Sequence, residues 1–445
     1  MLKKASGQTG VIQYVNLEDL VPAHHMLRRI RRVLRLEVIE EATRDCYSHT
    51  TGRPSVDPTV AFRMMLLGYL FNLSENRLCE ELPMHAGYLW FCGLDFNANV
   101  PDRTTLVKLR KHTWGERVFR QVMGSVVSDC IRAGLVKGTT LVADGTAVDA
   151  RAAITSLEPI APVMDLETYM NTQFVDAEEE SDTGPPPDGP THLADGDFRG
   201  GRFSNATHRS RTDRDARLYR KGKEGARLRY LVHNLLDYGS SVILETGATH
   251  AYGRLERPAA LALIDDCRQD HPDLRERFLL LDAGYTAGEF LAQVERRGLR
   301  PIVPTHGLRP PGRVVRPRTR VVAWDRLQRV RADQLAYRAL THAFENERPP
   351  WLARARVRIE RTFAEAKDDH GLRRARGYGL ETMNIQALIT AITQNLKRLA
   401  VHTHPDLGNV QARALFVAHR LVVSCLCASL APIARSLRPA LSQRF

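Results

Sequence analysis

The sequence predicts an α/β protein with a helical N-terminal region. Residues 15–130 carry several helix-start signals and few strand-like runs. Between residues 140 and 304, short apolar runs typical of strands alternate with helical segments, which indicates a mixed α/β core. Residues 352–399 are largely helical, with breaks around Gly371 and Gly377. The 445 residues and 43% hydrophobic content allow two or three domains with buried cores and exclude global disorder.

The helices of the N-terminal region are predicted from their first residues. Asp57 is a good N-cap, and Pro58 suits the first helical position that follows it. Ser74 and Asp102 are N-cap candidates for two further short helices. Short helices joined by turns resemble a helix-turn-helix region, so DNA contact and a packing or oligomerising role both stay open.

The core elements follow from apolar runs and helical periodicity. An acidic, proline-rich stretch at 176–190 cannot pack into a core and reads as a linker that interrupts it. The predicted strands are 140–144, 230–233, 241–245, 277–282 and 299–304, and the predicted helices of the core are 257–269 and 286–297.

Three regions result from these elements. We expect a helical N-terminal domain at 1–135 and a mixed α/β core at 136–400, which an insertion at about 155–210 interrupts. A basic helical tail at 401–445 follows.

The charge of the chain points to a polyanionic partner. Lys and Arg number 64 against 51 Asp and Glu, a formal net charge of +13. This balance favours nucleic acid first and an acidic membrane surface second. Residues 151–197 hold 11 acidic residues and one basic residue, whereas residues 301–380 hold 18 basic and eight acidic residues. The positive charge is therefore concentrated in blocks around a region that bears carboxylates.

The sequence also predicts the compartment. The longest apolar stretch, 421–434, is shorter than the roughly 20 residues that span a bilayer, and no apolar leader is found near Met1. The seven cysteines are scattered without a CxxC pair, which argues against a zinc site and a disulfide framework. We expect a cytoplasmic protein with reduced thiols and no membrane partner.

Two aspartates share one setting. Asp144 and Asp282 each end an apolar run and are followed by Gly or Ala-Gly. A carboxylate beside a buried strand is costly unless it is paired or binds a metal ion. Ligand sites in α/β sheets collect at the carboxyl ends of strands, so we expect both residues there. A cap or turn role is the alternative for each.

A third acid lies in a helical context near the C-terminal end of the core. Arg356 precedes Glu360 by four residues and Lys367 follows it by seven, so all three lie on one side of a helix. An ordinary Arg–Glu pair on a solvated helix is the alternative. Asp149, Glu365, Asp368 and Asp369 are competing acids, and an extended chain would turn Asp149 to the face opposite Asp144.

These residues resemble the DDE transposases of bacterial insertion elements. Arg356, Glu360 and Lys367 match R-x3-E-x6-K of the third motif, Y-x2-R-x3-E-x6-K, with Ala353 where tyrosine would stand. The segments Asp144-Gly145-Thr146 and Asp282-Ala283-Gly284-Tyr285 match the first two acidic motifs, and the likeness covers most of residues 11–400.

The resemblance implies an RNase-H-like catalytic core with a mixed sheet. It implies that Asp144, Asp282 and Glu360 are catalytic and bind two Mg²⁺ ions, with Asp144 bridging and Mn²⁺ as a substitute. Two such ions stabilise the attacking and leaving oxygens of a phosphodiester displacement. The implied activity is cleavage at element ends followed by 3′-hydroxyl strand transfer into target DNA.

The resemblance also implies partners. These are double-stranded DNA, as terminal inverted repeats and target, and a second copy of the chain in a nucleoid-associated complex. Ala353 keeps an inactive or co-opted DNA-binding protein as an alternative, and a nuclease without strand transfer would use the same site. The expected phosphate contacts are Arg356, Arg361, Lys367, Arg373, Arg374 and Arg376.

Overall fold

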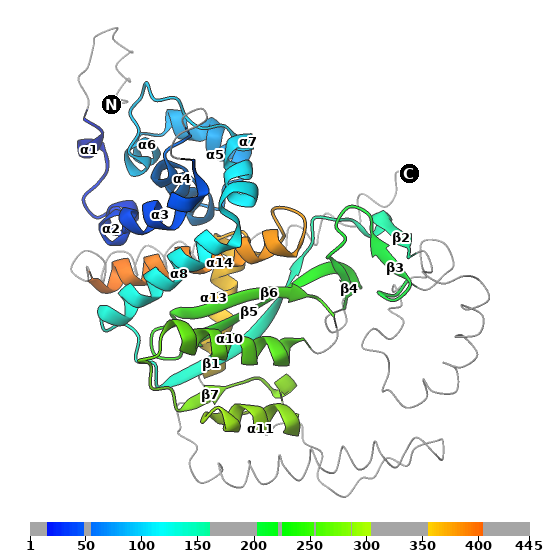
Figure 1. Cartoon of the computed structure of the whole chain (residues 1–445). Coiled ribbons are helices and arrows are strands. Elements are labelled where there is room, and N and C mark those ends of the chain that lie inside the picture. Colours follow the sequence, from blue (N-terminus) through cyan, green and yellow to red (C-terminus); the bar gives the residue numbers. More distant parts are fainter. Residues whose placement is uncertain are drawn as a thin grey trace, which may run out of the picture.

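The computed structural model describes residues 16–48, 55–160, 203–220, 225–252, 255–285, 287–303 and 355–403. Within these ranges a group of N-terminal helices lies on one side of a mixed α/β core (Figure 1). The linker, Ala353 and the tail beyond residue 403 fall outside the described residues.

The N-terminal helices begin where their capping residues predict. The Asp57 carboxylate accepts a hydrogen bond from the Thr59 amide at 2.7 Å. Ser74 and Asp102 cap the next two predicted helices in the same way. A π-helical segment, Leu109–Trp114, continues the last of these into α8. The helices are α1 (Leu17–Leu20), α2 (Met26–Val33), α3 (Leu36–Thr43), α4 (Pro58–Leu70), α5 (Glu75–Glu81), α6 (Ala86–Cys92), α7 (Arg103–Lys108) and α8 (Gly115–Arg132).

The core is built on one mixed sheet, which confirms the predicted fold class. Strand β1 pairs antiparallel with β5 on one side and parallel with β7 on the other, and β8 follows β7 in parallel. Strands β4 and β6 both pair with the far side of β5. This curled sheet is consistent with an RNase-H-like core. Its strands are β1 (Thr140–Asp149), β4 (Arg217–Tyr219), β5 (Arg227–Asp237), β6 (Ile243–His250), β7 (Phe278–Leu280) and β8 (Arg300–Ile302), and a separate pair is β2 (Leu157–Pro159) with β3 (His208–Ser210).

Helices cover both faces of the sheet. Figure 1 shows α10 (Glu256–Asp270) and α11 (Gly288–Arg296) in front of it, and α13 (Ala355–Asp369) behind it. Helix α14 (Leu380–Thr403) lies between the sheet and the N-terminal helices.

Helix α14 joins the two parts of the molecule. It packs against α2, α4 and α8 on one side and against β6 on the other. The Asn395 side chain donates to the Ile243 carbonyl at 2.7 Å and accepts from the Ile243 amide at 2.9 Å. Because β6 is an edge strand, α14 thereby satisfies peptide groups that would otherwise lack a strand partner. The domain limits at 135 and 400 stay predictions.

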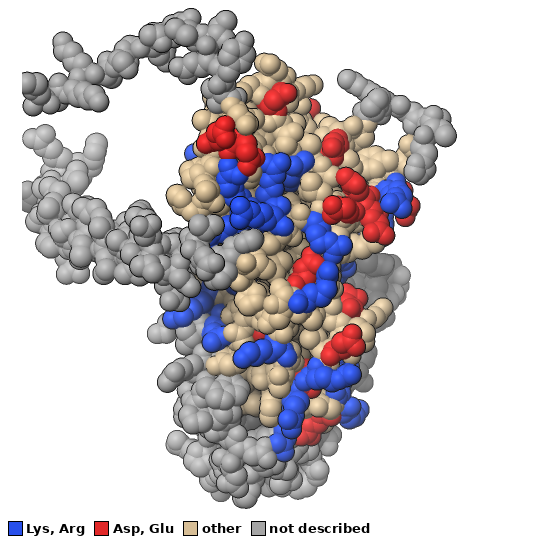
Figure 2. All heavy atoms as spheres, turned by 90° about the vertical axis from the view of Figure 1, so that its left-hand side faces the viewer, with Lys and Arg blue, Asp and Glu red and all other residues tan. Residues whose placement is uncertain are grey.

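The helical region presents mixed charge on one of its faces. Figure 2 shows basic side chains gathered in the upper half of that face, with acidic side chains beside them. Helix α2 contributes Arg28, which pairs with Glu18, and both Arg28 and Arg31 lie over the Trp90 ring. Part of this positive charge is therefore already neutralised. No helix in the described ranges is both long and apolar enough to span a membrane.

Candidate functional site

The register of two parallel strands brings Asp144 and Asp282 side by side. Thr140 lies opposite Phe278, and Val142 lies opposite Leu280. Asp144 and Asp282 each follow two residues after this last pair, so they stand at the same level on neighbouring chains. Adjacent strands lie about 4.8 Å apart, so the two residues stand on neighbouring segments of the chain.

The expectation that Asp144 ends its strand was wrong. Strand β1 stays paired with β5 as far as Asp149, which lies opposite Arg229. Gly145 does not end the strand but makes room for a side chain of β5, because a Cβ on it would lie 2.9 Å from Nδ1 of His233. Asp282, by contrast, lies just beyond the end of β7, as predicted.

Asp149 is not part of this pair of carboxylates. It lies five residues after Asp144 on the same strand, and alternation places it on the opposite face. Its carboxylate pairs with Arg229 at 2.7 Å and with Arg227 at 3.1 Å. The expected orientation is confirmed, and Asp149 has a structural partner of its own.

A buried tyrosine, Tyr285, lies three residues after Asp282. Tyr285 closes the turn after β7, and its amide donates to the Asp282 carbonyl at 3.0 Å. Burial raises the pKa of its hydroxyl, and the charges of Asp144, Glu256 and Asp282 raise it further. The hydroxyl is therefore a neutral group within electrostatic reach of three carboxylates.

Glu256 approaches β1 from the face opposite to Asp144, because neighbouring residues of a strand alternate and Glu256 faces Gly145. It is the first residue of α10, and its Cγ lies 3.7 Å from where a Cβ on Gly145 would stand. An acid in the first turn of a helix is ordinarily explained by its favourable interaction with the helix dipole. The sequence therefore does not distinguish Glu256 from other acids at helix starts. Only the packing of α10 against β1 reveals its place.

Glu360 lies on α13, the helix that covers the face of β1 to which Asp144 points. Val148 shares this face with Asp144 by alternation, and it lies in one core cluster with Ala366 of α13. Ile359 and Phe363 are also buried, whereas Glu360 is exposed. The packed side of the helix thus holds it on the sheet and leaves Glu360 accessible.

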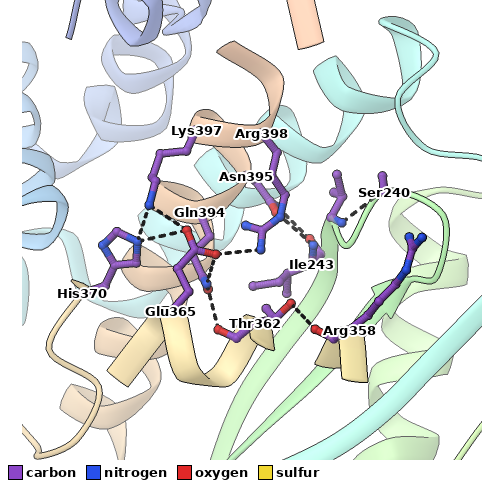
Figure 3. A network of polar contacts seen from close by, with 11 residues as sticks. Ser240, Ile243, Arg358, Thr362, Glu365, His370, Gln394, Asn395, Lys397 and Arg398 are labelled. Atoms are coloured by element: carbon purple, nitrogen blue, oxygen red, sulfur yellow. Dashed lines mark hydrogen bonds and ion pairs between the residues drawn. The ribbon is translucent and has the colours of Figure 1, made fainter. Parts of the chain in front are cut away.

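A polar network fixes α13 against α14 (Figure 3). The Glu365 carboxylate contacts Lys397 at 2.7 Å and Arg398 at 2.9 Å, and it accepts a hydrogen bond from Gln394 at 3.0 Å. Burial alone would raise the pKa of Glu365, but His370, Arg398 and Lys397 together hold it well below its usual range. Glu365 is therefore a stable anion whose role is to anchor the helix that carries Glu360.

The donor chemistry fits a hard divalent cation. Among the described residues, no three His, Cys, Asp or Glu side chains are gathered closely enough to hold one metal ion together. Mg²⁺ does not need such a cage, because it binds one or two carboxylates and takes its other ligands from water and substrate phosphates. Asp144 and Asp282, at the same level on neighbouring segments of the chain, are carboxylates of this kind.

The predicted phosphate contacts fall into two groups. Arg361, Arg373 and Arg374 are exposed, Lys367 is half-buried, and the Arg356 side chain lies outside what the structure describes. Arg376 differs from the others, because its guanidinium donates to the carbonyl groups of Leu73 and Gly68 in the helical region. These bonds give Arg376 a structural role that its sequence context did not indicate.

Two family models match the chain. One, described as a transposase domain (DUF772), matches residues 15–112, and the other, described as a transposase DDE domain, matches residues 203–396. The second match contains Asp282 and Glu360, and Asp144 precedes it. No curated protein and no solved structure matches the chain. The two matched domains follow one another along the chain, and the core has the mixed sheet expected of the second. The chain therefore belongs to the DDE transposases of insertion elements.

Proposed function

We propose that this transposase cleaves DNA at the ends of its insertion element and joins the freed 3′-hydroxyl to target DNA. Asp144, Asp282 and Glu360 form the reaction centre. The observation that carries the proposal is the register of β1 with β7, which brings Asp144 and Asp282 to the same level. Helix α13, which packs on the same strand, supplies Glu360.

The three carboxylates are the groups that would hold the metal ions. Asp144 and Asp282 offer adjacent oxygen ligands, and Glu360 adds a third from the helix side. Two Mg²⁺ ions bound there would stabilise the attacking and leaving oxygens of an in-line displacement at phosphorus, and Mn²⁺ would substitute for them. Tyr285 keeps its proton beside these charges and holds the turn that presents Asp282.

The basic side chains around α13 are proposed to hold the substrate. Arg361 follows Glu360 directly and is exposed. Lys367 lies about two turns after Glu360, on the same side of the helix as Glu360. Contacts from such residues to phosphate oxygens position DNA without reading its sequence. The substrates are terminal inverted repeats and target duplex, bound by a homodimer at the nucleoid.

Carboxylate variants test the reaction centre. The assay combines a labelled duplex that carries the inverted repeat beside the gene, a supercoiled target plasmid and Mg²⁺. We expect Asp144→Asn, Asp282→Asn and Glu360→Gln each to lower cleavage and joining at least ~100-fold, because second-shell changes at metal sites already cost 10–100-fold. DNA affinity should stay unchanged or rise, since each variant removes a negative charge.

Two exposed aspartates provide matched controls. The control variants are Asp273→Asn, at a residue before β7, and Asp369→Asn, at a residue on α13. Both should cleave like the unmodified chain, and thermal melts should show that all five variants are folded. Retained strand transfer in the Asp144, Asp282 or Glu360 variant would overturn the assignment. DNA binding without cleavage by the unmodified chain would support the inactive alternative, and nicking without joining would support a nuclease.

A further inference from the structure

We infer that a basic groove between the helical region and the core binds the sugar–phosphate backbone of the element-end duplex, several base pairs from the cleaved bond. The groove has a volume of about 490 Å³. This inference rests on the proposed function and adds a second DNA contact site to it.

Both parts of the molecule form the walls of the groove. The helical region contributes Ser74 and Asn76 around the start of α5, and Arg103 at the start of α7. The core contributes Arg151, which follows β1, and Arg374 from the segment between α13 and α14. Arginine, serine and asparagine side chains are typical donors to phosphate oxygens.

The positive charge of the groove is not neutralised from within the described chain. Arg103, Arg151, Arg374 and Arg376 line it, and none of the four has a carboxylate partner among the described residues. The acid in the lining, Glu75, pairs instead with Arg110. Four adjacent guanidinium groups without a counter-ion repel one another, and a polyanion relieves that repulsion.

Backbone contacts hold these arginines in place. The Arg374 guanidinium donates to the Arg151 carbonyl at 3.2 Å, and the Arg151 guanidinium donates to the Arg376 carbonyl at 3.0 Å. Arg151 also lies over the exposed ring of Tyr378, 5.6 Å from its centroid. Gln386 of α14 holds the Arg374 carbonyl at 3.0 Å. Carbonyl partners orient an arginine without cancelling its charge, so the groove is preorganised for an anion.

The position of the groove fits a duplex that also reaches the carboxylates. Arg151 lies seven residues beyond Asp144, just past the end of the same strand. At about 3.3 Å per residue, the two positions are ~23 Å apart. Because a duplex rises 3.4 Å per base pair, the groove would contact it ~7 base pairs from the cleaved bond. At this distance one duplex can reach both the groove and the carboxylates, and we take the cleaved DNA as the occupant.

Salt-dependent binding tests the groove. The probe is a fluorescein-labelled random duplex of about 30 base pairs in EDTA, and anisotropy gives Kd as a function of salt. We expect Arg103→Gln/Arg374→Gln to weaken binding roughly tenfold or more near 0.1 M salt, and to lower the slope of log K against log salt by about 2. The matched control, Arg117→Gln/Arg296→Gln, removes the same charge from exposed sites on α8 and α11 and should leave the slope unchanged.

A footprint provides the second readout. On a duplex that carries the element end, we expect hydroxyl-radical protection of the backbone ~7 base pairs from the cleavage position, lost in Arg103→Gln/Arg374→Gln but kept in the control. Equal slopes for the groove variant and the control, or an unchanged footprint, would overturn the groove and leave the proposed function intact. Failure of the unmodified chain to bind the duplex would overturn both.

Discussion

At the scale of single residues, burial decides the protonation of two groups in the sheet. Glu245, on the edge strand β6, is only 4% exposed. Burial and the nearby charge of Asp270 raise its pKa to about 8. His233, on the neighbouring strand β5, has a pKa lowered to about 4 by burial. Both groups are therefore neutral in the folded chain at mildly acidic pH.

Glu245 makes the unfolding free energy depend on pH in a defined window. Between about pH 6.5 and 8 the folded chain keeps a proton on Glu245 that the unfolded chain has released, so stability falls as pH rises. The expected slope is ~1.4 kcal/mol per pH unit, or about 2 kcal/mol across the window. Below pH 6.5, His233 acts with the opposite sign, because there the unfolded chain binds the extra proton.

Urea unfolding at pH 6.5 and pH 8 measures this slope. Glu245→Gln keeps the shape of the side chain and stays neutral, so its stability should hardly change across the window. Glu289→Gln, on the exposed side of α11, is the control and should keep the full slope. The same slope in Glu245→Gln as in the unmodified chain would contradict the assignment.

Single residues could be predicted from the sequence where a short local pattern indicates their position. Asp282 and Glu360 lie where a strand end and a helix face predict them. Asp144 lies within its strand and not at its end. Gly145 continues the strand, and the space beside it is filled by His233 of β5, a contact that the local sequence does not reveal. Glu256 carries no local signal for its position on the other face of β1, since only tertiary packing places α10 beside this strand.

At the scale of elements, α13 depends on one anion. Glu365 is partly buried and faces Lys397 and Arg398 of α14. Its neighbour His370 donates from Nδ1 to the Tyr69 carbonyl at 2.8 Å, which extends the network to α4. Loss of the Glu365 charge would leave two cations facing each other without a partner.

Glu365→Gln is therefore expected to lower the unfolding free energy by about 2–3 kcal/mol, which is less than for a fully buried pair because Glu365 is partly exposed. Urea denaturation measures the loss. Asp369→Asn, an exposed aspartate on the same helix, should change stability by less than about 0.5 kcal/mol. Cleavage should fall with Glu365→Gln even where the chain stays folded, because α13 carries Glu360. Equal stability of the two variants would rule out the anchoring role.

The elements that the sequence predicted best are those with local caps. Helix α4 begins after Asp57, and α5 and α7 begin after Ser74 and Asp102, because an N-cap acts on amides two or three residues away. The order of strands in the sheet has no such local signal. It follows from pairings such as β1 with β5, which join residues some ninety positions apart.

At the scale of the whole molecule, the helical region and the core share one hydrophobic core. Phe119 of α8, Leu244 of β6 and Ile392 of α14 belong to a single buried cluster. Arg376 adds a polar link, because its guanidinium binds the carbonyls of Leu73 and Gly68 and lies 4.1 Å from the centroid of the Tyr69 ring. We therefore expect the two parts to unfold together.

Hydrogen exchange tests this coupling. In the unmodified chain, peptides from α4 and from β5 should exchange with similar free energies of opening. Arg376→Gln removes the link, so α4 should open at a lower free energy while β5 is unchanged. Arg373→Gln is the control, because that exposed side chain pairs only locally, with Asp368. Equal protection of α4 in the two variants would show that the link does not couple the parts.

The placement of α14 has a consequence for how the protein is made. This helix fills the space between α8 and β6, yet it is the last element of the described chain to leave the ribosome. Until Leu380–Thr403 has emerged, the apolar faces of the earlier elements have no cover. A product truncated before Leu380 would keep Asp144, Asp282 and Glu360 but would expose those faces. Premature termination should therefore yield an aggregation-prone or rapidly degraded fragment rather than a partly active enzyme.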